Sequence, residues 1–247
     1  MANIIGIHNT GIHSSLFSVV NKKFFGIPEE RLSRIKYDKF FPTKNLNIFL
    51  EKNKISKKNK IKFIIAWNPI LNINERYRPS ISEWSSHPAE RLYSNINHVI
   101  PNLSLDLDNA TKIIFDKSNQ AEFIYLNHHL AHSYNSFYCS GYKSSAIFSC
   151  DAYGETATTF WGIGNGNKIE EIKTTNFPHS LGQLYSTITQ FLGFKPTLDE
   201  WKVMSLASYG NPKRYLKDFK KLVKIKNNGE FELNLNYFNF YIFDKKN

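Results

Sequence analysis

The densest group of chemically active side chains is the run Asn127-His-His-Leu-Ala-His132. On an α-helix, His128 and His132 are four residues apart and project from one face, so both imidazoles can bind one metal ion. A carboxylate is the usual third ligand for iron, manganese or zinc. Asp151 follows a predicted buried strand, at the kind of strand end where open sheets place ligand-binding groups. The spacing predicts a metal site of these three residues; packing of the histidines in a partly buried helix is the alternative.

The loop after Asp151 has the composition of a phosphate-binding turn. Gly154 lets the backbone approach a ligand closely, and the threonines that follow Glu155 offer hydroxyl donors to phosphate oxygens. Gly154 and Glu155 are therefore candidate cofactor-binding residues. An ordinary hairpin in which Asp151 caps the turn is the competing interpretation.

A charged segment, Glu29 to Asp38, places basic side chains among carboxylates after the first predicted strands. Arg31 and Lys36 are candidate ligands for phosphate or carboxylate oxygens, because guanidinium and ammonium groups bind such anions. Runs of this kind more often form a solvated charged helix, and that alternative stays open.

These residues need strands and helices to position them. Short apolar runs separated by turn residues predict a three-stranded meander at the start and a second meander after the histidine helix. Mixed sheets covered by helices are the expected architecture. The expected strands are 4–7, 16–20, 24–27, 61–67, 122–126, 145–150, 156–163 and 168–174, and the expected helices are one starting at 43 and those at 128–138, 180–192, 201–208 and 212–223.

Two further features of this scaffold can be predicted. The helix that carries the histidines should stop at Gly141, where a left-handed cap costs no Cβ strain. The stretch from 68 to about 121 is rich in Pro, Ser, Asn and Arg, and is expected to be an irregular insertion with one helix after Asn109.

The composition excludes several classes of protein. With 247 residues, 41% of them hydrophobic, the chain can bury a substantial core, so general disorder is excluded. No apolar run is long enough to cross a bilayer, and no membrane association is expected. Two cysteines and a start unlike a secretory signal favour a cytoplasmic location. The formal net charge of +11 favours polyanions, but Lys outnumbers the Arg that base-reading proteins prefer, so nucleic acid is not the expected ligand.

Several segments occur in the order typical of one family. They are Ile5-Gly-Ile7, His13-Ser-Ser15, Glu29 to Lys36, His128 to His132, Cys150 to Glu155, Phe177 to Gly182 with Tyr185, Leu192-Gly-Phe194 and Lys202 to Gly210. Together they resemble the amino-terminal domain of the O-carbamoyltransferases that decorate nodulation factors and antibiotics. The resemblance runs from the first residues to about Gly210.

The resemblance implies an α/β, actin-like ATPase (ribonuclease H-like) fold with mixed sheets, related to the threonylcarbamoyl-transferring enzyme of tRNA modification. Residues 1–210 would form the carbamoyltransferase amino-terminal domain, with the irregular insertion at about 68–121. Residues 211–247 would start the connection to a second half that this sequence lacks, so the fold would be incomplete there.

The family also implies a reaction and its ligands. A carboxyl-terminal domain makes carbamoyl-adenylate from carbamoyl phosphate and ATP, and the amino-terminal domain transfers the carbamoyl group to a hydroxyl of a small-molecule acceptor. By resemblance, His128, His132 and Asp151 hold Fe²⁺ or another divalent metal that binds the nucleotide phosphates, and His13 is catalytic. The implied residues for binding ATP or carbamoyl-adenylate are Arg31, Lys36, Gly154, Glu155 and Lys202.

The resemblance leaves the role of this chain open. The adenylate-forming domain would be supplied in trans by a partner polypeptide, or the chain would be a fragment. One alternative is a non-catalytic fragment or subunit that binds nucleotide, and another, suggested by the basic charge, is a tRNA threonylcarbamoyl-transfer relative. The segments from Phe177 to Gly182 and from Lys202 to Gly210 favour the small-molecule branch.

Overall fold

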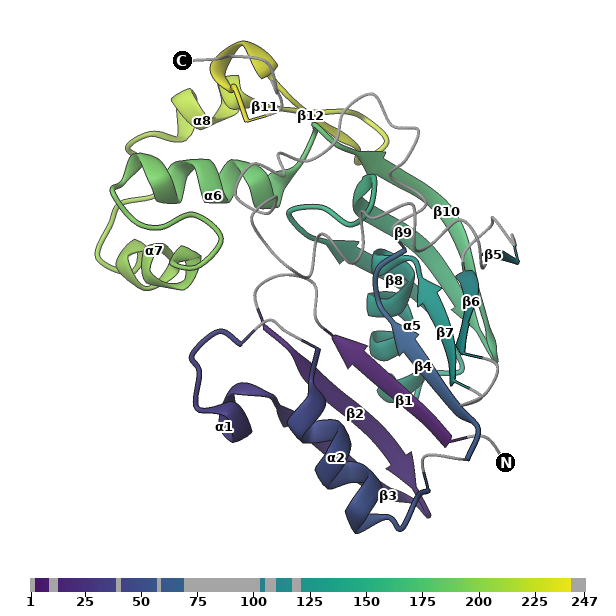
Figure 1. The fold of residues 1–247 in the computed structure, drawn as a ribbon. Helices are drawn as coiled ribbons and strands as arrows, with labels where there is room; N and C mark the ends of the chain where they lie inside the picture. Colours follow the sequence, from purple (N-terminus) through teal and green to yellow (C-terminus); the bar gives the residue numbers. More distant parts are fainter. Residues whose placement is uncertain are drawn as a thin grey trace. The chain divides into compact units, whose positions relative to one another are not determined.

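Groups of strands are followed by helices along the chain (Figure 1). The computed structural model describes residues 3–8, 13–38, 41–56, 59–68, 103–104, 110–116 and 121–240. These residues form two compact units, one up to Ala131 and one from His132 onward. Both units combine strands with helices, which confirms the expected α/β class with mixed sheets.

Unit 1 is built on a seven-stranded sheet. Its strands are β1 (Asn3–His8), β2 (Ser15–Val20), β3 (Lys23–Pro28), β4 (Ile61–Ile65), β5 (Leu103–Ser104), β6 (Ala110–Asp116) and β7 (Ala121–Leu126). They lie in the order β3-β2-β1-β4-β7-β6-β5. The first three form the expected antiparallel meander, whereas β4 pairs parallel with both β1 and β7. The sheet is therefore mixed.

Helix α2 (Thr43–Lys52) supplies the aromatic centre of the unit 1 core, and it begins at Thr43 as expected. Phe49 of this helix is fully buried, with its ring centroid 5.2 Å from that of Phe25 on β3. A short helix, α1 (Glu30–Ser33), precedes it. The core side chains around Phe49 are Ile5, Ile7, Leu16, Leu50, Ile61, Phe63, Ile65 and Tyr125.

Two expectations for unit 1 are wrong in detail. The segment after Asn109 is strand β6 rather than a helix, because its backbone pairs antiparallel with β7, from Ala110 opposite Leu126 onward. The strand expected at 61–67 ends at Ile65, and it alternates buried and half-buried residues instead of being buried throughout. The rest of the expected insertion, 69–102, 105–109 and 117–120, lies outside the described residues.

Unit 2 contains the second expected meander. Its strands are β8 (Ser144–Cys150), β9 (Ala157–Asn165) and β10 (Lys168–Asn176), which pair antiparallel in the order β10-β9-β8. Helix α5 (His128–Ser140) packs on this sheet through Phe137. The first four residues of the helix belong to unit 1 and the rest to unit 2. A Cβ atom at Gly164 of β9 would lie 2.5 Å from the Phe137 ring, so only glycine leaves room for the helix. Gly141 follows α5 with a φ of +79°, which confirms the predicted stop.

The remaining elements of unit 2 are three helices and a small hairpin. They are α6 (Leu181–Phe191), α7 (Glu200–Ala207), α8 (Leu216–Leu222), β11 (Val223–Ile225), β12 (Phe231–Leu233) and the 3-10 helix η3 (Leu235–Tyr237). Leu233 and Phe238 pack against Leu184 of α6, so the chain returns to this helix after the hairpin.

The helix expected at 212–223 is shorter than predicted. Asn211 accepts hydrogen bonds from the backbone N–H of Lys213 (3.0 Å) and Arg214 (3.1 Å), which holds a separate turn before α8. The helix therefore starts at Leu216, and it ends at Leu222 because Val223 enters β11.

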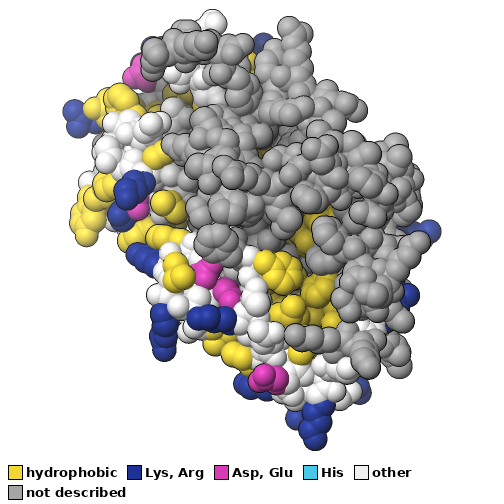
Figure 2. Space-filling view, viewed as in Figure 1, with side chains coloured by type: hydrophobic (Ala, Val, Ile, Leu, Met, Phe, Trp, Pro, Cys, Tyr) yellow, Lys and Arg dark blue, Asp and Glu magenta, His cyan; other side chains and the backbone are white. Residues whose placement is uncertain are grey.

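On the face drawn in Figure 2, Lys and Arg side chains are scattered among other side chains rather than gathered in one patch. Within the described ranges, no helix has the length and the apolar content needed to cross a bilayer.

Candidate metal centre

The start of α5 places the two candidate histidine ligands. The Asn127 side chain accepts a hydrogen bond from the backbone N–H of Leu130 at 2.9 Å, as an N-cap residue does. The helix therefore begins at His128, directly after β7, and His132 lies one turn further along. The local sequence thus decides that these two imidazoles share a helix face.

The structure brings the three predicted ligands together. The candidate ligand atoms of His128, His132 and Asp151 all lie within 4.8 Å of one another. His132 Nε2 and Asp151 Oδ2 lie 3.5 Å apart. Two ligands that each lie about 2.1 Å from a common ion are at most about 4.2 Å apart. Small side-chain rotations would therefore suffice to bring all three donors onto one ion.

The His128 ring is held in one tautomer. Its Nδ1 atom lies 3.1 Å from the backbone oxygen of Ala66, and because a carbonyl oxygen only accepts, Nδ1 carries the proton. Nε2 is then the nitrogen with a lone pair for a metal, which is the arrangement common among metal-bound histidines. The Trp67 ring lies 5.4 Å from the His128 ring and helps to orient it.

The cluster has one buried and two accessible members. His128 is 9% exposed, whereas the side chains of His132 and Asp151 are 52% and 42% exposed. A site with this graded exposure can fix an ion from one side and leave another side open to a ligand.

Asp151 is oriented by its own loop. The carboxylate Oδ1 accepts a hydrogen bond from the backbone N–H of Ala152 at 2.7 Å, which turns Oδ2 toward His132. The loop is also fastened to α6: the hydroxyl of Ser180, the N-cap residue of that helix, donates to the backbone oxygen of Ala152. A Cβ atom at Gly182 would lie 2.4 Å from Ala152 N, so loop and helix are in direct backbone contact.

The other candidates of unit 2 lie beyond this loop and on α7. The N–H of Gly154 donates to the oxygen of Ala157 at 2.6 Å, which closes the turn, and Glu155 is only 1% exposed. Lys202 already has a carboxylate partner, because its Nζ lies 2.8 Å from Asp199 Oδ1. The hydrogen bond from Lys202, followed by that from the Lys195 backbone, lowers the pKa of the Asp199 carboxyl.

The remaining candidates, His13, Arg31 and Lys36, belong to unit 1. All three are exposed. The His13 ring lies 5.3 Å from the Tyr37 ring, and Lys36 Nζ lies 5.0 Å from the centre of the same ring. Tyr37 therefore joins two of the three candidates, although neither spacing nor charge pointed to it.

Residues 3–244 match the family model described as Carbamoyltransferase N-terminus. The chain belongs to this family. Membership agrees with the mixed α/β architecture described above.

Individual relatives of this carbamoyltransferase-family chain are longer. The uncharacterized protein sll1178 of Synechocystis is 32% identical over 255 residues, an alignment that covers 97% of this chain and 40% of that protein. The nodulation protein NolNO of Sinorhizobium fredii is 26% identical over 244 residues, covering 94% of this chain and 33% of NolNO. Among solved structures, YeaZ from Pseudomonas aeruginosa aligns over 71% of this chain and 65% of its own, at 8% identity and a TM-score of 0.33, a likeness too loose to carry an argument.

One residue of the charged family segment has a role that the sequence did not suggest. Glu29 is 3% exposed, and its carboxylate accepts hydrogen bonds from the backbone N–H groups of Lys44 (2.9 Å) and Asn45 (3.0 Å). It therefore caps the N-terminus of α2, where a negative charge is favourable. No local signal could have revealed this contact, because its partners lie 15 and 16 residues away in the chain.

We expect Glu29→Ala to destabilise the protein by about 2–3 kcal/mol, because the partly buried N–H group of Lys44 and the buried N–H group of Asn45 lose their acceptor and a void forms. The exposed neighbour Arg31 provides the control: Arg31→Ala should change the unfolding free energy by less than about 0.5 kcal/mol. Urea denaturation followed by circular dichroism measures both values. Equal stabilities for the two variants would show that the Glu29 carboxylate does not support α2.

Proposed function

We propose that this chain is the amino-terminal part of an enzyme that transfers a carbamoyl group from carbamoyl-adenylate to a hydroxyl of a small-molecule acceptor. The observation that carries the proposal is the cluster of His128, His132 and Asp151 in a chain that matches the carbamoyltransferase N-terminus family over residues 3–244. The family supports the carbamoyl chemistry, and the cluster supports metal assistance.

The donor set of the cluster suits a divalent metal ion. Two imidazole nitrogens and one carboxylate oxygen are ligands that iron, manganese and zinc accept, and we propose Fe²⁺ or another divalent ion. The hydrogen bond between His128 Nδ1 and Ala66 O supports this fit, since it leaves Nε2 as the donor. When bound, such an ion would neutralise negative charge on the phosphate oxygens of the nucleotide.

The transfer itself exchanges one carbon–oxygen bond for another. The acceptor oxygen bonds to the carbamoyl carbon, the bond from that carbon to the phosphate oxygen of the adenylate breaks, and AMP leaves. The acceptor hydroxyl loses its proton, and His13 is the proposed base. The exposed cations Arg31 and Lys36, with Lys202 and the loop residues Gly154 and Glu155, are proposed to bind ATP or carbamoyl-adenylate.

Carbamoyl-adenylate needs a source. We propose a carboxyl-terminal adenylate-forming domain, supplied in the same polypeptide or in trans, that makes it from carbamoyl phosphate and ATP. The lengths of the relatives leave room for such a domain, since this chain spans 40% of sll1178 and 33% of NolNO. The 247-residue chain by itself is expected to release no pyrophosphate from ATP and carbamoyl phosphate.

The proposal can be tested by ligand binding. A sulfamoyl analogue of carbamoyl-adenylate is titrated into the Fe²⁺-loaded or Co²⁺-loaded chain by calorimetry, with AMP as the reference ligand. We expect the analogue to bind at least about tenfold more tightly than AMP. This preference should disappear in Asp151→Asn, because tight binding would depend on a metal ion held by the Asp151 carboxylate together with the two histidines. Asp218→Asn, which changes an exposed carboxylate of the same unit with no proposed role in binding, is the matched control. Equal affinities of the analogue for the native chain and Asp151→Asn would contradict the proposal.

A further inference from the structure

The segment between β10 and α6 connects the end of the described chain with the loop that carries Asp151. We propose that His179, in this segment, is a positioning residue through which the β11–β12 hairpin fixes the backbone that presents Asp151 to the metal cluster. The inference rests on the metal site of the proposed function, to which it adds His179, a residue of the family segment Phe177 to Gly182 that had no assigned role.

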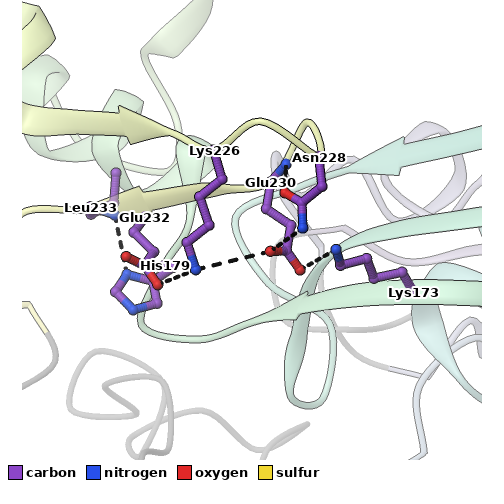
Figure 3. Close-up of polar contacts among 7 residues, drawn as sticks. All are labelled: Lys173, His179, Lys226, Asn228, Glu230, Glu232 and Leu233. Carbon is purple, nitrogen blue, oxygen red and sulfur yellow. Dashed lines mark hydrogen bonds and ion pairs between the residues drawn. The ribbon is translucent and has the colours of Figure 1, made fainter.

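The side chain of His179 holds the hairpin. The backbone N–H of Leu233 in β12 donates to His179 Nδ1 at 3.1 Å (Figure 3). Because Nδ1 accepts, it carries no proton, and the neutral ring has its proton on Nε2. β12 is a three-residue strand whose sheet partner is β11. The imidazole of His179 supplies the hydrogen-bond acceptor that a second neighbouring strand would otherwise offer to the Leu233 N–H group.

Charged side chains keep the hairpin in this position. Figure 3 shows Lys173 of β10 paired with Glu230 of the hairpin turn. Lys226 Nζ lies 2.5 Å from Glu232 and 3.9 Å from Glu230, and Asn228 donates to Glu230 at 2.9 Å. The hairpin turn is thus tied to β10 through Glu230, and Lys226 is paired with Glu232 of β12; these partly exposed ion pairs support the position of the hairpin without making the contact to His179 themselves.

The backbone of His179 is held by β9. Its carbonyl oxygen accepts from the hydroxyl of Thr158 at 2.6 Å, and that hydroxyl is buried in β9. The next residue, Ser180, places its Oγ 3.3 Å from the oxygen of Asp151 and in hydrogen-bond contact with the oxygen of Ala152. Two adjacent residues, His179 and Ser180, therefore make the contact to the hairpin and the contact to the backbone of a proposed metal ligand.

Close packing keeps α6 and the Asp151 loop in a fixed position relative to each other. A Cβ atom at Gly182 would lie 2.4 Å from Ala152 N and 2.7 Å from the carbonyl carbon of Asp151. Leu184, one half-turn further along α6, packs with Leu233 of the hairpin. A shift of the hairpin is therefore passed to α6 and to the Asp151 loop together.

The neutral state of His179 is required for this contact. Burial is the main cause that lowers the pKa of His179; Lys226 lowers it further and Glu232 opposes the shift. Since the pKa in the folded chain is below the ordinary value of about 6.5, the unfolded chain binds the proton more readily. The contribution of His179 to stability is therefore present above about pH 6.5 and declines as the pH falls below it. In a protonated ring Nδ1 would carry a hydrogen, which would face the N–H group of Leu233 and break the hydrogen bond.

Three variants of the full chain test the proposal, with Co²⁺ as the probe at about pH 7.5. His179→Leu removes the acceptor, whereas His179→Asn keeps one, because the Asn Oδ1 lies near the position of Nδ1. Lys173→Met is the matched control, since it removes another anchor of the same hairpin but leaves the contact to Leu233. We expect His179→Leu to bind Co²⁺ about tenfold more weakly and with an altered visible spectrum. His179→Asn and Lys173→Met should stay within about twofold of the native chain.

Amide exchange at Leu233 supplies a readout that does not depend on metal. Its protection factor should fall between about pH 7.5 and about pH 5.5 in the native chain but not in His179→Asn, which has no group to titrate there. Unchanged Co²⁺ affinity and spectrum in His179→Leu would overturn the positioning role, as would equal losses in all three variants. If the native chain binds no Co²⁺ while the pH-dependent protection is present, the metal site of the proposed function is wrong and the positioning role falls with it.

Discussion

The His132→Ala variant is expected to lose the bound metal. Only His128 and Asp151 would remain as ligands, and two donors chelate a divalent ion poorly, so the affinity should fall by at least about 100-fold. Alanine favours the helix, and the His132 side chain is largely exposed, so α5 should form as before. Metal analysis of chains purified and reconstituted with Fe²⁺ under anaerobic conditions measures the effect.

A second position on α5 provides the control for this experiment. Asn135 is also exposed on the helix and is not a member of the ligand cluster. Asn135→Ala should therefore keep the metal content of the native chain. Equal metal content in the native chain and His132→Ala would show that the cluster is a set of neighbouring side chains without an ion.

Gly182→Ala is expected to be among the most destabilising substitutions of the second unit. Alanine inside a helix usually gains up to about 1 kcal/mol over glycine. Here the new methyl group would lie 2.4 Å from Ala152 N and 2.5 Å from Ala152 Cα, and backbone cannot rotate away as a side chain does. The clash should outweigh the gain and leave a net loss of about 3 kcal/mol, near the upper end of overpacking costs.

Gly210→Ala separates this clash from a general effect of glycine replacement. Its nearest neighbour, the oxygen of Ala207, would lie 3.5 Å from the new Cβ, which is ordinary contact. We expect less than about 0.5 kcal/mol of change there. Urea denaturation gives both values, and Co²⁺ titration of Gly182→Ala should also show weaker binding, since the Asp151 loop must move. A Gly182→Ala chain as stable as Gly210→Ala would show that α6 and the loop are not in close contact.

Much of the scaffold could be predicted from local patterns. Both meanders were expected from short apolar runs between turn residues, and they occur as β1–β3 and β8–β10. The helix that carries the histidines begins after Asn127 and ends before Gly141, because a cap and a left-handed glycine are local requirements. Such features depend on a few neighbouring residues, so they can be predicted from a single sequence.

The failures arise where a distant partner decides the structure. The segment 110–116 was expected to contain a helix, but pairing with β7 makes it a strand, and strand pairing overrides a weak local preference. The helix expected from Pro212 starts at Leu216, because Asn211 holds a separate turn. The return of the chain to α6 through Leu233 and Phe238 likewise depends on packing between distant segments.

The candidate site divides in the same way. The sequence by itself determined that His128 and His132 share a helix face and that Asp151 directly follows a strand, because helix period and strand position are local properties. Only the tertiary structure decided that Glu29 caps α2 and that His179 binds the backbone of Leu233, 54 residues away. Hydrogen bonds between segments far apart in the chain have no sequence period. They form where folding brings a buried N–H group to an acceptor, so only the folded chain reveals which polar residues hold the site in place.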